Sequence, residues 1–154
     1  SWVAPFFMAP INTKNIHRSN VLMDHIYGEN FCYNEMWIQG TGDEGKAAAD
    51  FISKSNPLSN APKPGEGPSR ESRENGNYDL LFCGDIDDKS IHVSVTGDMD
   101  PGYGSTSKMI TESAVCLVKE CDDLKGGIYT SASSMGTKLI KRLVDNAGLT
   151  FELE

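Results

Sequence analysis

Two neighbouring runs of alternating apolar and polar residues constrain the fold of this chain more than any other feature. The first run covers Tyr78 to Ile86, the second covers Ser90 to Gly97, and only Asp87-Asp88-Lys89 separates them. Because successive side chains of a strand point to opposite faces, the two runs predict a β-hairpin whose second strand has one wet face. The middle of the chain is therefore expected to form antiparallel sheet.

Helix and strand patterns occur on both sides of this hairpin. The expected elements are a strand or extended segment over Trp2 to Met8, a helix from Asn12 or Thr13 to Gly28, a strand over Phe31 to Ile38, a helix over Lys46 to Ile52, a helix over Ser105 to Cys121, a short strand between Leu124 and Thr130, a helix from Ser133 or Ser134 to Gly148, and a last strand over Leu149 to Leu153. Helices separate some strands and a hairpin joins two others. This order favours an α+β fold, with a mixed, mainly antiparallel sheet packed with helices, over a doubly wound parallel sheet.

Residues 55–77 differ in kind from the rest of the chain. They include four prolines and three glycines, and Leu58 is their only large apolar residue. A segment so poor in core residues is either an exposed functional loop or a mobile linker. We expect a solvated excursion within a single domain that spans residues 1–154.

Charge and apolar content narrow the functional class. Fourteen basic and 22 acidic residues give a net charge of −8, which repels phosphodiester backbones, so no nucleic-acid partner is expected. The longest apolar stretch, Trp2 to Pro10, is far shorter than the ~20 residues of a membrane span and lacks the flanks of a signal peptide. We therefore expect a cytoplasmic protein without a transmembrane segment. Ser1 stands where an initiator Met is expected, which suggests a piece excised from a longer protein.

The string from Asp100 to Lys108 is the most suggestive motif. It combines two glycines, three hydroxyl residues and a lysine at the start of a predicted helix, where free N–H groups and the helix dipole favour an anion. It matches neither a Walker loop, because Ser107 precedes Lys108, nor a dinucleotide fingerprint, because Ser107 replaces the third glycine. A sharp hairpin-to-helix turn, with proline and glycines setting the backbone, explains the same residues.

A second polar group lies on the first predicted helix. Asn12, Arg18 and Asn20 stand beside an apolar face, and an arginine can hold a carboxylate or phosphate through two parallel hydrogen bonds. An ordinary solvated helix face explains them equally well.

The histidines and cysteines predict no metal centre. The three histidines have no cysteine or carboxylate at ligand spacing, so no metal site is expected. The four cysteines show no C-x-x-C spacing and are expected to be reduced thiols. Cys116 and Cys121 lie five residues apart on one predicted helix, about 140° around its axis, so we expect them to point in different directions as packing residues.

Four strings in the same order, running together from about Val3 to Glu154, carry a family resemblance. They are PFFMAPINTKNIHRSNVL, KPGEGPSRESRENGNYDLLF, GDMDPGYGSTSKMITESAVCL and GGIYTSASSMGTKLIKRLVDNAGLTFEL. Together they resemble the C-terminal half of the saccharopine dehydrogenase-like oxidoreductases, a group that includes bacterial trans-acting enoyl reductases. In that family a Rossmann domain with the cofactor loop comes first, and the second domain contacts the substrate and often another subunit.

The resemblance implies the C-terminal, substrate-side domain of an NAD(P)-dependent oxidoreductase, which is not catalytic alone. NAD(P) would be bound mainly by the N-terminal Rossmann domain, which is absent from this chain, and no cofactor is expected on the chain itself. The implied partners are that Rossmann domain, a small-molecule or acyl substrate and, in a homodimer, a second copy.

The candidate binding residues follow from the two polar groups, and none has an assigned catalytic role. Anchors for a substrate or cofactor anion are expected at Asn12, Arg18 and Asn20, and a polar rim at a helix start is expected at Tyr103, Ser105, Thr106 and Lys108. The alternative function is a non-catalytic binding or dimerisation module that uses the same α+β sheet as an interaction surface. A third is an anion-binding enzyme built on the turn that ends at Lys108.

Overall fold

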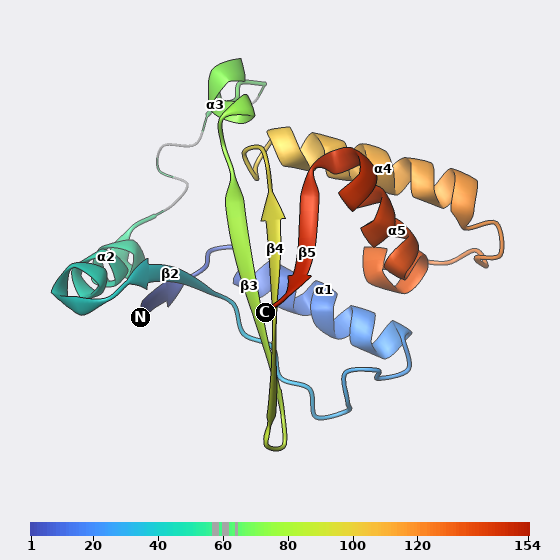
Figure 1. Cartoon of the computed structure of the whole chain (residues 1–154), viewed down its shortest axis with the longest axis horizontal. Helices are drawn as coiled ribbons and strands as arrows, with labels where there is room; N and C mark the ends of the chain where they lie inside the picture. The colour runs from blue at the N-terminus through green and yellow to red at the C-terminus, as the bar shows by residue number, and fades with distance from the viewer. Residues whose placement is uncertain (57–58, 60–61, 64) are drawn as a thin grey trace. The chain divides into compact units, whose positions relative to one another are not determined.

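The computed structural model describes residues 1–56, 59, 62–63 and 65–154. Residue contacts divide the chain into two compact units, Ser1–Ala61 and Pro62–Glu154, whose boundary falls within the proline- and glycine-rich segment. The first unit contains a two-stranded sheet and the second a three-stranded sheet, and all the strand pairs described are antiparallel (Figure 1). The α+β class and the mainly antiparallel sheet are confirmed, and the single continuous domain stays a prediction.

The first unit packs one helix against a small sheet. Its elements are β1 (Trp2–Pro5), α1 (Ala9–Leu22), β2 (Met36–Gly40) and α2 (Gly42–Lys54). Helix α2 packs on both strands. A Cβ at Gly45 would lie 2.6 Å from the carbonyl carbon and oxygen of Gly40, so the helix approaches β2 backbone to backbone. Glycine at position 45 is what permits this contact.

Helix α1 begins and ends earlier than the sequence predicts. It starts at Ala9 instead of Asn12 or Thr13, because Pro10 suits the first turn, where its missing N–H costs nothing. It ends at Leu22 instead of Gly28, since Asp24 and His25 both take a φ of 56° and leave the helical region. The buried residues of this helix are polar, Ser19 and Asn20.

The predicted strand over Phe31 to Ile38 is wrong in its position. The observed strand β2 covers Met36–Gly40, and residues 31–35 have no regular structure. The aromatic residues of that stretch form ring contacts instead of a strand ladder. The Phe31 ring centroid lies 5.2 Å from that of Tyr27 and 5.6 Å from that of His17. Aromatic side chains thus produced a strand-like pattern in a segment held by ring packing.

The second unit is built around the hairpin. Its elements are α3 (Arg70–Glu74), β3 (Tyr78–Ile86), β4 (Lys89–Gly97), α4 (Gly104–Glu120), α5 (Ser131–Ala147) and β5 (Leu149–Leu153). The hairpin register runs from the pair Tyr78–Gly97 to the pair Ile86–Lys89, so the predicted hairpin forms with Lys89 in β4 instead of in the connection. Strand β5 adds to the free side of β4, so the order is β3-β4-β5.

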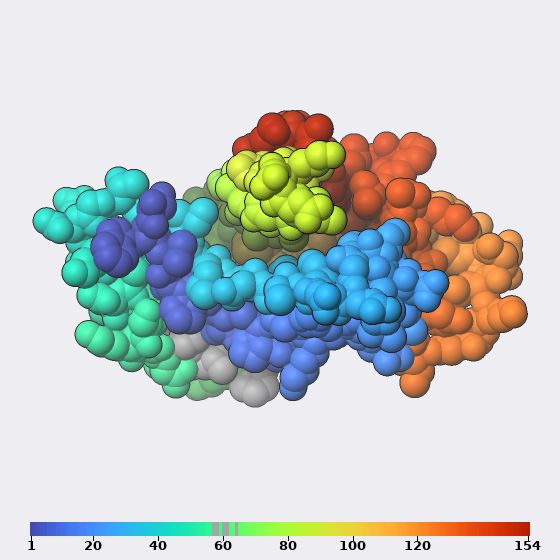
Figure 2. All heavy atoms as spheres, turned by 90° about the horizontal axis from the view of Figure 1, so that it is seen from below, coloured from blue at the N-terminus to red at the C-terminus, as the bar shows by residue number. Residues whose placement is uncertain are grey.

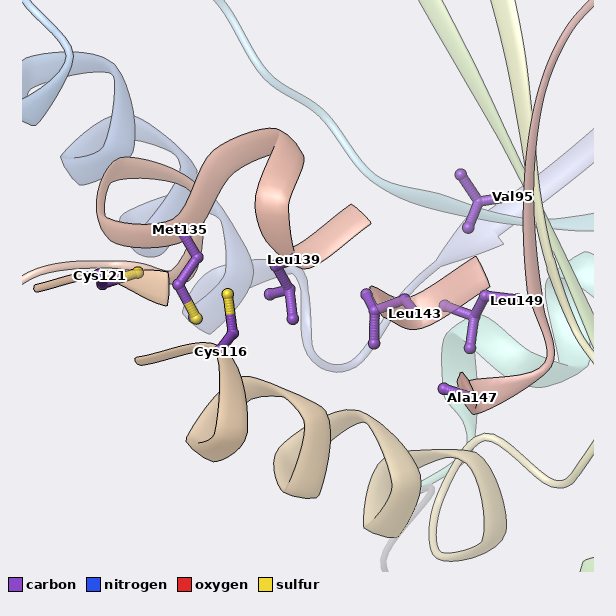
Figure 3. Close-up of a cluster of buried hydrophobic side chains, with 8 residues drawn as sticks. All are labelled: Val95, Cys116, Cys121, Met135, Leu139, Leu143, Ala147 and Leu149. Atoms are coloured by element: carbon purple, nitrogen blue, oxygen red, sulfur yellow. The ribbon is translucent and has the colours of Figure 1, made fainter. Parts of the chain in front are cut away.

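The three-stranded sheet has one apolar face, and the helices cover only part of it. The register places the following side chains on this apolar face: Leu80, Phe82, Ile86, Ile91, Val93, Val95, Leu149, Phe151 and Leu153. Val95 and Leu149 join the buried core with Leu139 and Leu143 of α5, as Figure 3 shows. The hairpin tip faces the viewer in Figure 2. Toward this tip the same face stays exposed, at Phe82, Ile86 and Ile91.

The connection between α4 and α5 also differs from the prediction. No strand forms between Leu124 and Thr130, and α5 opens at Ser131, ahead of Ser133 or Ser134. The Thr130 side chain accepts the Ser133 N–H while the Ser133 hydroxyl accepts the Thr130 N–H, so this capping box sets the start of the helix. At Gly136 the backbone takes φ 50° and ψ −131°, so α5 consists of two helical parts.

The two cysteines at the end of α4 lie in one core instead of pointing in different directions. Cys121 is the C-cap, with φ −120° and ψ 36°, so it has left the helical course that the 140° separation assumes. Both side chains are buried beside Met135 (Figure 3). Burial raises the pKa of the Cys116 thiol, and the neighbouring Cys121 adds to this rise. The packing role expected for both cysteines fits this placement.

Candidate functional site

The turn between β4 and α4 brings most of the predicted polar rim together. Strand β4 ends at Gly97 and α4 begins at Gly104, with Asp100 in the turn between them. The Asp100 carboxylate accepts the backbone N–H groups of Gly102, at 3.0 Å, Tyr103, at 3.1 Å, and Gly104. These donors belong to the helix start that the sequence marks as an anion site. The protein supplies its own anion there.

The electrostatics of the turn keep this carboxylate ionised. The bond from the Gly104 N–H is the main cause that lowers the pKa of Asp100, and the bonds from Tyr103 and Gly102 and the charge of Arg73 add to it. Desolvation opposes the shift but does not reverse it. An external phosphate would have to displace a bound carboxylate and would meet its negative charge. The sharp-turn interpretation of this motif therefore fits the geometry better than an open anion cradle.

The segment before β3 folds over this turn. The Asp100 N–H donates to the Arg73 carbonyl at 3.0 Å, and a Cβ on Gly76 would lie 2.6 Å from the Asp100 backbone nitrogen. A Cβ on Gly67 would lie 3.2 Å from the Tyr103 ring. Figure 1 shows α3 and the turn at the same end of the three-stranded sheet. The described part of segment 55–77 thus includes a short helix docked on the turn, and residues 57–58, 60–61 and 64 lie outside the described residues.

The hydroxyl groups of Ser105 and Thr106 in the rim are hydrogen-bonded within the protein. Ser105 is fully buried, and its hydroxyl lies 2.8 Å from the Tyr78 hydroxyl. The Thr106 hydroxyl donates to the Pro101 carbonyl at 2.7 Å. The Lys108 ammonium lies 3.3 Å from an Asp98 oxygen in a partly exposed ion pair. Of the four predicted rim residues, Tyr103, Thr106 and Lys108 reach the surface, whereas Ser105 supports the turn from inside.

A shallow depression of about 290 Å³ lies beside the rim. Its lining comes from the first turns of α4 and the last turn of α5: Ser107, Lys108, Thr111, Glu112 and Asn146. The Asn146 amide donates to Glu112 at 3.2 Å, and Glu112 also pairs with Arg142 at 2.6 Å. All five lining residues have polar side chains, and Lys108 and Glu112 carry opposite charges, so the depression can contact a polar part of a ligand.

The other predicted anchors belong to the first unit. The Asn12 amide donates to both carboxylate oxygens of Glu35, at 3.0 and 3.1 Å. The Asn20 amide donates to the Gly28 carbonyl and accepts the Tyr27 N–H, both at 2.8 Å, so it shapes the turn after α1. Arg18 is exposed on the same helix.

Sequence reasoning missed an apolar groove in the first unit. It has a volume of about 450 Å³, and it is lined by Pro5, Phe7, Trp37, Ile52, Ser53 and Ser55. These residues come from β1 and the turn after it, from β2, and from the end of α2. The signal in the sequence was the apolar run Trp2 to Pro10, which we interpreted as an extended segment without assigning it a site.

Metal-binding clusters and membrane-spanning helices are both absent from the part of the chain that the structure describes. Among the described residues, no three histidine, cysteine, aspartate or glutamate side chains are grouped so as to hold a metal ion. Within the same part of the chain, no helix has both the length and the apolar character that crossing a bilayer demands.

The described residues form an α+β fold in which the Asp100 carboxylate caps the start of α4. Comparison with known proteins identifies relatives by name. No family model matches the chain, and no solved structure matches it. A Mycobacterium tuberculosis protein that carries the provisional name trans-acting enoyl reductase is 33% identical over 92% of the chain. Proteins named trans-acting enoyl reductase from Mycobacterium ulcerans and Mycobacterium bovis are 29% and 28% identical over the same share.

The chain is therefore similar in sequence, along nearly its whole length, to proteins named trans-acting enoyl reductases. It spans 39% of the length of each of these curated relatives. The wider saccharopine dehydrogenase-like grouping stays a prediction.

Proposed function

We propose that this chain is the substrate-side, C-terminal part of an NAD(P)-dependent oxidoreductase of the saccharopine dehydrogenase-like group, and that it acts on an enoyl, that is α,β-unsaturated acyl, substrate. The similarity to trans-acting enoyl reductases over 92% of the chain carries this proposal. The 39% share of those relatives supports a division of labour with another domain, in which this chain contributes substrate contacts and is not catalytic alone.

The turn before α4 does not fit the phosphates of a nicotinamide dinucleotide. The helix start that could receive a pyrophosphate holds the Asp100 carboxylate, which would repel it. We therefore place the cofactor on a Rossmann domain that would precede this chain in the complete protein. In this chain, the surface groups at Arg18, Tyr103 and Lys108 remain our candidates for polar contacts with the substrate.

A chimera tests this proposal. The matching 39% of the Mycobacterium ulcerans relative is replaced by this chain, and NADPH oxidation is followed with an α,β-unsaturated acyl thioester. We expect turnover by the chimera and none by this chain alone. A folded chimera that binds NADPH and reduces no enoyl thioester contradicts the proposal. So does micromolar NADPH binding by the isolated chain in a fluorescence titration, because the cofactor site would then lie here.

The exposed apolar face of the three-stranded sheet favours a second candidate function, a dimerisation module. Its uncovered part includes Leu80, Phe82, Ile86, Ile91 and Leu153. Contiguous exposed apolar patches of this kind mark interaction sites. A second copy of the chain would cover this face with an identical one, as twofold symmetry requires.

Sedimentation of two matched variants tests the dimerisation module. Phe82 is 45% exposed on the apolar face and Leu81 is 47% exposed on the opposite face. If the apolar face forms a dimer, Phe82→Glu sediments as a monomer and Leu81→Glu as a dimer. A native chain that is monomeric at all concentrations removes the dimerisation module.

A further inference from the structure

The apolar groove of the first unit has a chemical character that neither the polar rim nor the sheet face shares. It is formed by the turn after β1, by Trp37 of β2, and by Ile52 at the end of α2. Its volume of about 450 Å³ falls within the range typical of small-molecule sites, roughly 300–1,000 Å³. All of its lining residues belong to one compact unit.

Among the described residues that line the groove, none carries a charge and both serine hydroxyls are hydrogen-bonded within α2. None of its six residues is ionisable. The Ser53 hydroxyl donates to the Ala49 carbonyl and the Ser55 hydroxyl donates to the Phe51 carbonyl, both at 2.7 Å. These bonds turn each hydroxyl back onto α2. A charged or strongly polar ligand would lose its hydration here without new partners, whereas an apolar ligand loses nothing.

The walls of the groove are held in place before any ligand arrives. Phe6 packs edge-on against the Trp37 ring at 6.0 Å and contacts Phe7 at 5.2 Å. Ala4 is fully buried and pairs with Trp37 across the two-stranded sheet. Little ordering is therefore required when a ligand binds.

We propose that this groove receives the hydrocarbon part of an acyl substrate. The proposal rests on the proposed function, because the relatives' name specifies an enoyl group, and an enoyl thioester is a small polar head on an apolar chain. The groove suits the apolar chain, and its uncharged lining excludes the head. Aromatic rings at Phe7 and Trp37, each half-exposed, leave its mouth open to solvent.

Tryptophan fluorescence can report binding, because the chain has two tryptophans and only Trp37 lines the groove. In a Trp2→Phe background Trp37 is the sole tryptophan, and phenylalanine keeps an aromatic ring beneath the Lys46 ammonium, which lies 5.4 Å from the Trp2 ring centroid. The probes are saturated hexanoyl, octanoyl and decanoyl thioesters of N-acetylcysteamine, and no cofactor is added.

We expect a saturable change in Trp37 fluorescence and an affinity that rises with chain length. A fully buried methylene contributes about 0.8 kcal/mol, which is about fourfold in Kd, and a half-exposed one about twofold. Each added methylene should therefore tighten binding by about two- to fourfold. An affinity that does not change with chain length overturns the proposal, as does the absence of a saturable signal.

Two neighbouring positions on α2 provide a matched pair of variants. Ile52 lines the groove, whereas Phe51 is 72% exposed and does not line it. Ile52→Glu should weaken octanoyl thioester binding more than about tenfold, because a carboxylate replaces apolar lining. Phe51→Glu should change it less than about twofold. Ile52→Ala, which is expected to fold, serves if Ile52→Glu does not, and should weaken binding by several-fold. Equal effects at positions 51 and 52 overturn the proposal.

The outcome can be told apart from failure of the proposed function. Binding is measured without NADPH and without turnover. If the chain binds acyl thioesters but the chimera reduces none, the proposed groove stands and the proposed reductase function is contradicted. An active chimera whose KM is unchanged by Ile52→Ala removes the groove alone. A Trp37 signal that depends on protein concentration without any thioester shows that a second copy fills the groove, which also overturns the proposal.

Discussion

Adding a single methyl group at Gly76 tests the docking of the segment before β3 on the site turn. A Cβ at this position would lie 2.6 Å from the Asp100 Cα and backbone nitrogen. Ordinary contacts between non-bonded carbon atoms are about 3.5–4.0 Å. The obstacle is backbone and cannot rotate away, so the two segments must separate by about 1 Å in Gly76→Ala. That shift would strain the bond from the Asp100 N–H to the Arg73 carbonyl.

The size of the effect follows from two opposing contributions. Overpacking costs about 1–3 kcal/mol, and loss of chain freedom in the unfolded state returns about 0.4–1 kcal/mol. Near the middle of both ranges, the net destabilisation of Gly76→Ala is about 1–2 kcal/mol. For a cooperative unit the size of Pro62–Glu154, each kcal/mol lowers Tm by about 4–8 °C, so the expected fall is about 4–16 °C.

Thermal melting followed by circular dichroism measures this change, and Gly126→Ala is its matched control. A Cβ on Gly126 meets nothing within 4 Å, and its φ lies outside the left-handed region. The control should therefore be as stable as the native chain or more stable by up to about 1 kcal/mol. If Gly76→Ala and Gly126→Ala have the same Tm, the segment before β3 does not contact the Asp100 turn as described.

Two further predictions concern the site carboxylate and the core. Because the folded pKa of Asp100 is lowered, its stabilisation is full above the unfolded value, about pH 4, and is lost as the pH falls through the folded value. Asp100→Asn should therefore flatten the acid loss of Tm below about pH 4, and equal acid sensitivity of the two proteins would contradict the capping role. Leu143 is 8% exposed and Val144 is 47% exposed on the same helix. Urea unfolding should show a loss of about 2–5 kcal/mol for Leu143→Ala and about 0.5 kcal/mol or less for Val144→Ala, and similar losses would refute the assigned core.

The hairpin was predictable because its signals are local. Strict alternation over the second strand and a tight polar connection predict a hairpin, which the structure confirms. The long helix after the site turn was predicted within one residue, as Gly104–Glu120 against Ser105 to Cys121. In both cases periodicity, cap and burial agree with one another.

The misplaced elements were those where a local signal met a longer-range contact. The first helix was expected to begin at Asn12 or Thr13, although Pro10 already stands in its first turn. The helix stops before Gly28 because Asn20 hydrogen-bonds to the turn that follows it. The aromatic residues around Phe31 pack on rings from earlier in the chain. Nothing in a strand pattern distinguishes such packing from pairing with a neighbouring strand.

The turn at the start of α4 was predicted, but the hydrogen bonds that occupy its amides were not. The glycines and hydroxyls around Tyr103 do form a turn at a helix start. The aspartate two residues before Gly102 is a short acceptor suited to bonding the backbone ahead of it, and this signal could have shown that the amides are already occupied. The apolar run Trp2 to Pro10 marked one wall of the groove, but the groove itself depends on how α2 meets the strands, which no local pattern shows.

The non-helical backbone at Gly136 divides α5 into two helical segments joined by a kink. Its φ of 50° with a ψ of −131° is accessible to glycine and closed to residues with a side chain. The short helical segment before the kink contains Met135, and the long segment after it contains Leu139 and Leu143. In hydrogen exchange the amides of the short segment should exchange independently of those of the long segment. In a library of substitutions at position 136, we expect only glycine to be tolerated.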